Sequence, residues 1–101
     1  MFTDDFTFGF PPKRYALEAY RQLLAEVAPG APWMIAGLGV DVTPIAADAL
    51  AMGAGLRVGL EDAPLGCTRR NLDLVTGAVA AMRDAGFEPA TPDEVRSRFR
   101  G

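Results

Sequence analysis

The stretch WMIAGLGVDVTPIAADALAMGAGLRVGLE, residues 33–61, carries the pattern of a strand, a helix and a second strand. Its first part, residues 33–40, is a nearly unbroken apolar run, which is typical of a parallel strand covered on both faces. Its last part, residues 55–61, also has the length of a strand, and about a dozen residues separate the two runs. Strands joined by such a crossover form a parallel, right-handed βαβ unit.

Three residues mark the limits of the helix inside this unit. Thr43 is expected to be the N-cap, Pro44 suits the first helical position, and Gly53 suits the position just past the last turn. The sequence therefore predicts a short helix that ends directly before the second strand.

Helices are also expected on both sides of the βαβ unit. Apolar residues recur at helical spacing over residues 12–28 and again over residues 71–85, where Gly86 follows as a stop signal. Thr91 is followed three residues later by a glutamate, which is the pattern of a capping box at the start of a short terminal helix. The predicted apolar face of the first helix contains Ala16, Tyr20, Leu23, Leu24 and Val27, and that of the second contains Leu72, Val75, Ala78, Val79 and Met82.

This order of elements predicts an α/β fold, either a (β/α)8 barrel or a doubly wound sheet. The aromatic stretch FTFGF, residues 6–10, is compatible with the end of one more short strand. Two or three parallel strands cannot close a barrel and would leave strand edges exposed. We therefore expect residues 1–101 to be a single segment of a larger fold, completed either by the rest of a longer chain or by another chain.

The composition excludes several classes of function. The chain has 101 residues and a formal net charge of −3, with acidic and basic residues interleaved, so nucleic acid is not an expected partner. No apolar run approaches the ~20 residues that span a bilayer, so no membrane partner is expected. The single cysteine cannot form an internal disulfide, which suits the cytoplasm. The chain has no histidine, so a metal held by this segment alone would need carboxylates and at most one thiolate.

Three charged residues, Arg57, Glu61 and Asp62, interrupt the second predicted strand. The Cα atoms of Arg57 and Glu61 would lie roughly 13 Å apart in a strand, too far for a simple pair. Arg57 is therefore expected to extend toward a carboxylate at the strand's end, with Asp62 as a candidate. Active sites of α/β folds lie at the carboxyl ends of parallel strands, where one carboxylate can bind a metal and another can move a proton. From the pattern alone, a solvated strand face with Asp62 capping a turn is an equally good interpretation.

Four stretches occur in an order and spacing that match a known enzyme family: WMIAGLG (33–39), LRVGLED (56–62), NLDLV (71–75) and ATPDEVR (90–96). They resemble the C-terminal part of the β-keto acid cleavage enzymes, a family founded on 3-keto-5-aminohexanoate cleavage. FGFPP (8–12) resembles the loop after an earlier strand of that family. The resemblance covers nearly the whole chain and implies the last two to three βα units of a (β/α)8 TIM barrel.

The resemblance also implies a zinc-dependent condensation, in which a β-keto acid and acetyl-CoA yield acetoacetate and a new acyl-CoA while zinc polarises the keto oxygen. By position, it implies Glu61 as a zinc ligand, Asp62 as the residue that removes the substrate proton, and Arg57 as the arginine that orients it. Gly37 and Gly39 would then hold a phosphate of coenzyme A on backbone N–H groups, or serve only as a tight exit from the strand. The complete enzyme is expected to be a homo-oligomer.

The chain departs from the family pattern in its metal ligands. The family's other zinc ligands are two histidines in an H-x-H sequence, and this chain has no histidine. A catalytic serine and a further glutamate of the family come from earlier strands and have no counterpart here. We therefore expect the isolated chain to be inactive. The alternative is a non-catalytic α/β module that associates with itself.

Overall fold

The computed structural model describes residues 1–4, 9–64 and 66–100. Its elements, in chain order, are α1 (Arg14–Val27), β1 (Met34–Ile35), the 3-10 turn η1 (Thr43–Ile45), α2 (Ala46–Ala51), β2 (Gly55–Leu56), α3 (Asn71–Asp84) and α4 (Pro92–Phe99). This α/β arrangement confirms the predicted order of helices and strands from residue 12 onward. Residues 5–8, which hold most of the aromatic stretch, lie outside the described residues, so the strand suggested there stays a prediction.

The two strands β1 and β2 pair in parallel, as predicted for a βαβ unit. Met34 lies opposite Gly55 and Ile35 lies opposite Leu56. A further hydrogen bond, from the Arg57 N–H to the Ile35 carbonyl at 2.9 Å, continues the ladder by one step. The regular pairing is much shorter than the predicted strands, because glycines interrupt both apolar runs and weaken strand structure there.

The N-terminus contributes a third parallel segment that the sequence pattern did not reveal. The Phe2 N–H donates to the Ala36 carbonyl at 2.8 Å, and the Phe2 carbonyl accepts a hydrogen bond from the Leu38 N–H at 2.8 Å. Successive carbonyls of a strand point to opposite sides, so Phe2 lies on the side of β1 away from β2. A segment this short has no periodicity to detect.

The crossover between the strands begins with η1 rather than with the predicted N-cap. The Thr43 N–H and hydroxyl both donate to Asp41 Oδ1, at 2.9 and 2.6 Å. The prediction of Thr43 as the N-cap is wrong, because Asp41 supplies the capping oxygen two residues earlier. The predicted stop at Gly53 is confirmed by its φ of +84° and by the hydrogen bond from the Ala54 N–H to the Ala49 carbonyl at 3.0 Å.

The core lies on one face of the sheet, against α1 and α2. It contains Phe2, Ala16, Leu17, Ile35, Val42, Ile45, Ala49 and Ala54. On the opposite face, Met34 is 60% exposed, so the prediction of a strand covered on both faces is wrong within the described part of the chain. Arg57 shares the face of Met34, because side chains alternate along a strand. Helices on one face and an uncovered second face are compatible with a part of a barrel.

The buried face of α1 is narrower than predicted. Ala16 and Leu17 are buried and Tyr20 packs against the core, but Leu23 and Val27 are exposed.

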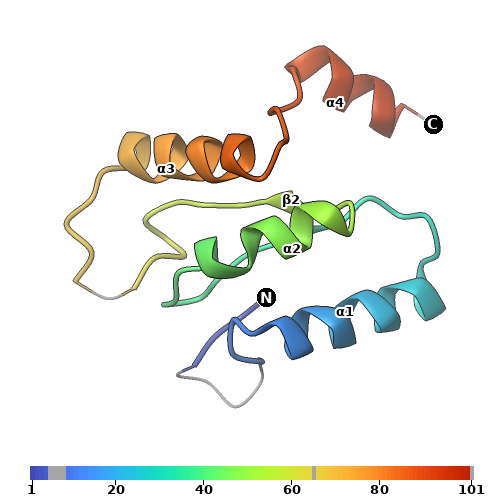
Figure 1. The fold of residues 1–101 in the computed structure, drawn as a ribbon, viewed down its shortest axis with the longest axis horizontal. Coiled ribbons are helices and arrows are strands. Elements are labelled where there is room, and N and C mark those ends of the chain that lie inside the picture. The colour runs from blue at the N-terminus through green and yellow to red at the C-terminus, as the bar shows by residue number, and fades with distance from the viewer. Residues whose placement is uncertain (5–8, 65, 101) are drawn as a thin grey trace.

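The last two helices form where they were predicted, but neither buries a side chain. The Thr91 N–H donates to Glu94 Oε2 at 2.7 Å and the Glu94 N–H donates to Thr91 Oγ1 at 3.2 Å, which confirms the capping box. Gly86 follows α3 with a φ of +86°, as expected for a stop signal. In Figure 1, α1 and α3 lie on opposite sides of α2, and α4 extends beyond the end of α3. None of the described helices is long and apolar enough to cross a membrane.

Candidate functional site

A tight turn after β2 carries the predicted acidic residues. The Asp62 N–H donates to the Gly59 carbonyl at 3.1 Å, which closes the turn. The Leu60 N–H donates to Asn71 Oδ1 at 2.9 Å, so the first residue of α3 holds the turn in place. The Asp62 carbonyl accepts a hydrogen bond from the Gly39 N–H at 3.0 Å. The turn is therefore anchored both to α3 and to the loop after β1.

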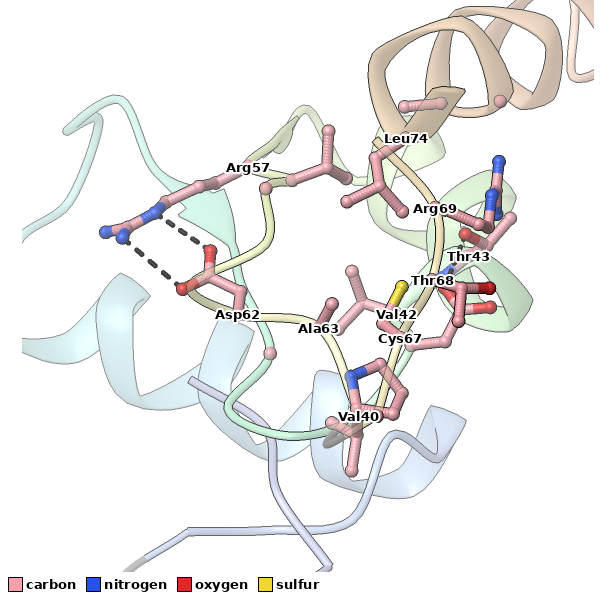
Figure 2. A pocket seen from close by; sticks show the side chains of 18 residues that line it. Val40, Val42, Thr43, Arg57, Asp62, Ala63, Cys67, Thr68, Arg69 and Leu74 are labelled. Atoms are coloured by element: carbon pink, nitrogen blue, oxygen red, sulfur yellow. Dashed lines mark hydrogen bonds and ion pairs between the residues drawn. The ribbon is translucent and has the colours of Figure 1, made fainter. Parts of the chain in front are cut away.

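Arg57 contacts both carboxylates of this turn. Its Nε lies 3.0 Å from Asp62 Oδ2, and its Nη2 lies 3.3 Å from Asp62 Oδ1 and 3.4 Å from Glu61 Oε2. The predicted contact between Arg57 and Asp62 is confirmed, as Figure 2 shows. The expectation that Glu61 lies too far from Arg57 is wrong, because the chain leaves the extended conformation before Glu61 and the turn brings both carboxylates back toward the guanidinium.

The two carboxylates differ in burial. The Asp62 side chain is 8% exposed, whereas the Glu61 side chain is 84% exposed. Asp62 Oδ2 lies within ion-pair distance of Arg57 Nε, but the contact lacks hydrogen-bond geometry, and no described residue donates a hydrogen bond to this oxygen. Buried oxygen atoms are rarely left without a donor, so Oδ2 has an unused hydrogen-bond acceptor position within the described chain.

A cavity of about 560 Å³ opens beside the Arg57–Asp62 pair. Figure 2 shows the pair on one side of this cavity and Thr43, Cys67 and Arg69 on the other. Its volume falls in the range of roughly 300 to 1,000 Å³ that is usual for small-molecule pockets. Because the sequence contains no histidine, no histidine of this chain can activate the Cys67 thiol.

A second cavity of about 390 Å³ adjoins the same turn. It is lined by Glu61 and Asn71, and Arg57 and Asp62 line both cavities. Arg57 and Asp62 therefore lie between the two cavities. The smaller cavity contains the exposed Glu61 carboxylate, and the larger one contains the Arg69 guanidinium and the Cys67 thiol.

The two glycines predicted to hold a phosphate both have a backbone role. A Cβ on Gly37 would collide with the Val40 carbonyl oxygen, and Gly39 has a φ of +71°. The Gly39 N–H already donates to the Asp62 carbonyl, so it is not free to bind an anion in this structure. These facts favour the tight strand exit, and the phosphate-binding role stays a prediction.

The donor set for a metal is incomplete in the described chain. Residues 1–4, 9–64 and 66–100 contain no group of three or more His, Cys, Asp or Glu side chains that could hold a metal ion. Protein zinc sites use three or four protein ligands. Glu61 is exposed and fits as one ligand, but the described residues do not form a zinc centre by themselves.

Sequence reasoning did not identify Asn71 or Arg69 as parts of the site. Asn71 holds the turn, and Arg69 lines the larger cavity. The available signal for Asn71 was an asparagine at the start of a helix, a position where its side chain often binds backbone groups. Arg69 carried no such signal, because its place depends on how the loop after β2 packs against α3.

Comparison with known proteins identifies the family. A family model described as beta-keto acid cleavage enzyme matches residues 1–100. A 3-keto-5-aminohexanoate cleavage enzyme from Fusobacterium nucleatum subsp. nucleatum is 38% identical over 75 residues, which cover 70% of this chain and 28% of that relative. The chain thus spans less than a third of this relative's length. No solved structure matches the chain significantly. Because the family model matches almost the entire chain, the chain belongs to the β-keto acid cleavage enzyme family.

Proposed function

We propose that this chain is the C-terminal part of a zinc-dependent β-keto acid cleavage enzyme with a (β/α)8 barrel, which converts a β-keto acid and acetyl-CoA to acetoacetate and a new acyl-CoA. The observation that carries the proposal is the buried Asp62 carboxylate, held by Arg57 and with one oxygen that accepts no hydrogen bond from a described residue. It lies at the carboxyl end of a parallel strand, where α/β enzymes place their chemistry.

In the proposed mechanism, the Asp62 carboxylate accepts the substrate proton. Arg57 supplies the counter-charge to the buried carboxylate, and its two contacts fix the orientation of Asp62. Bound zinc would polarise the keto oxygen of the substrate, and Glu61 would contribute one of its ligands. The turn held by Asn71 keeps the two carboxylates in adjacent but different environments, one buried and one accessible.

The remaining parts of the active site lie outside this chain in the proposal. The matched part of the chain spans 28% of its Fusobacterium relative, and further strands would pair with the edge of β2 that faces away from β1. The uncovered face of Met34 and Arg57 would then look into the interior of the barrel. The isolated chain is then inactive, and the complete enzyme is a cytoplasmic homo-oligomer that takes a β-keto acid and a CoA thioester.

A chimera tests this function directly. This chain replaces the matched part of the Fusobacterium enzyme, and zinc content and acetoacetate formation are measured. We expect turnover in the chimera, loss of zinc in Glu61→Gln, and loss of turnover with zinc retained in Asp62→Asn. A folded chimera in which both variants keep full activity would refute the site assignment.

The exposed apolar side chains of α3 and α4 favour one alternative, a non-catalytic module that associates with itself. That alternative predicts a folded oligomer of defined size from this chain alone, measured by light scattering, together with a zinc-free chimera that does not turn over.

A further inference from the structure

The larger cavity contains an arginine that the proposed reaction does not use. Arg69 lies in the loop before α3, and its Nη2 donates to the Asp73 carbonyl at 2.8 Å. No carboxylate is ion-paired with Arg69 among the residues that the structure describes, whereas Arg57 is paired with Asp62 and Arg70 with Asp73. A guanidinium has five N–H donors. Arg69 is exposed, and within the described chain its other N–H donors have no hydrogen-bond partner beside the cavity.

A glycine in the middle of α3 makes room for this side chain. Gly77 is disfavoured relative to alanine by helix propensity alone. A Cβ at position 77 would lie 3.0 Å from Arg69 Nη2, which is tighter than ordinary contact. Gly77 and Arg69 line the same cavity. Their contact gives a physical reason for glycine at a position where the helix itself would favour a side chain.

The other charged groups at this cavity are already engaged. Asp41 Oδ1 accepts two hydrogen bonds from Thr43, and Asp62 is paired with Arg57. The Asp73 carboxylate, on the helix surface next to Arg69, is bound by Arg70; the hydrogen bonds from Arg70 are the main cause of its lowered pKa, and the charge of Arg69 adds a smaller contribution. Arg69 is thus the cation of this wall whose charge no direct carboxylate contact neutralises within the described chain.

We infer that Arg69 anchors an oxyanion of the ligand in this cavity, with Gly77 giving the guanidinium its place against α3. The planar fork of a guanidinium suits carboxylate and phosphate groups through paired hydrogen bonds. The identity of the anion rests on the proposed function: it is the carboxylate of the β-keto acid or a phosphate of coenzyme A. The Arg57–Asp62 pair on the other side of the cavity would then face the reacting part of the same ligand.

A titration of the isotope-labelled chain, without zinc, tests this inference. The arginine Nε–Hε signals and the Gly77 amide are followed by NMR while acetoacetate or adenosine 3′,5′-bisphosphate is added, and methyl acetoacetate serves as the uncharged control. We expect saturable shifts of the Arg69 and Gly77 signals with one of the two anions and none with the ester. The anion that saturates at the lower concentration identifies the source of the oxyanion.

Matched variants separate the site from general charge effects. Arg69→Gln should weaken anion binding by about tenfold or more, while Arg83→Gln, which removes the same charge from α3 outside the cavity, should change it by less than about twofold. Gly77→Ala should weaken binding without lowering the thermal midpoint, because alanine favours the helix. Equal losses in the two arginine variants, unchanged binding in Gly77→Ala, or no saturable binding would overturn the inference. Because the readout needs neither zinc nor turnover, an inactive chimera with intact anion binding would count against the proposed function alone.

Discussion

The segments up to β2 and the two helices after it are stabilised in different ways. In the first region, Phe2, α1, β1 and α2 share one core, and Leu17 is 0% exposed. In the second, α3 and α4 bury no side chain, and Leu72 is 65% exposed. The sequence pattern predicts amphipathic helices in both regions, and helices form there in both. An amphipathic sequence is therefore not enough to bury a helix. A face is buried only where another segment is present to cover it.

The last two helices are well formed because their ends are satisfied locally. In α4, Thr91 and Glu94 exchange hydrogen bonds, and in α3 the Arg70 N–H donates to Asp73 Oδ2 at 3.0 Å. Such caps need only neighbouring residues, whereas the core of the first region joins segments from residue 2 to residue 56. The uncovered apolar residues of α3 and α4 are Leu72, Val75, Val95 and Phe99.

The largest change in the free energy of unfolding should come from truncating a core side chain. The same truncation in α3 is the matched control. Leu17→Ala is expected to lower the free energy of unfolding by about 2–5 kcal/mol, because it leaves a cavity in a fully buried site. Leu72→Ala makes the same chemical change on an exposed surface and should change it by less than about 0.5 kcal/mol. Urea denaturation followed by circular dichroism measures both. A comparable loss in Leu72→Ala would mean that α3 is covered in solution, and the contrast between the two regions would fail.

Breaking the Arg57–Asp62 ion pair, which lies at the boundary of the two regions, is expected to lower the free energy of unfolding by less. Arg57→Gln leaves the Asp62 carboxylate buried without its counterion and should cost about 1–3 kcal/mol, less than for a fully buried pair because the Arg57 side chain is 47% exposed. The matched control is Arg83→Gln, which breaks the exposed pair with Glu88 and should cost less than about 0.5 kcal/mol. Adding Asp62→Asn to Arg57→Gln should recover part of the loss in a urea titration. If Arg57→Gln is as mild as its control, the pair is not an anchor of the site.

The smallest effect is a response of α4 to acid that α1 should not share. The hydrogen bond from the Thr91 N–H holds the pKa of Glu94 below its usual value of 4.5. A carboxyl with a lowered pKa in the folded state stabilises the helix above its unfolded pKa, and this contribution is lost as the pH falls below 4.5 and through the lowered value. The first turn of α1 contains no acidic residue.

Carbon chemical shifts measured by NMR between about pH 6 and pH 3 test this response. They should show loss of helix in the first turn of α4 and little change in the first turn of α1. Glu94→Gln should remove most of the pH dependence, because its side chain does not titrate. An α4 that keeps its helicity unchanged down to pH 3 would show that the capping box contributes nothing measurable.

The candidate site shows where sequence reasoning succeeds and where it stops. The contact between Arg57 and Asp62 was predictable, because a cation in a strand needs a carboxylate within reach and Asp62 follows at the strand's end. The contact with Glu61 was not, because it depends on where the strand ends and on a turn closed by the Gly59 carbonyl. Asn71 carried a local signal, as an asparagine at a helix start, but its partner Leu60 is decided by how α3 packs against the turn. Arg69 joins the site through the same packing, which no local pattern specifies.

The sequence by itself determined the elements whose signals are local: the helices α1 and α3, the first of which begins two residues after its predicted start, the glycine stops at Gly53 and Gly86, and the capping box at Thr91. Their causes lie within a few neighbouring residues, so the pattern is sufficient. Only the tertiary structure decided that Phe2 extends the sheet, that Met34 faces away from the core, and which of the two acidic residues is buried. These outcomes depend on contacts between segments far apart in the chain. Whether a side chain is buried or a backbone group is hydrogen-bonded depends on which distant segment packs against it.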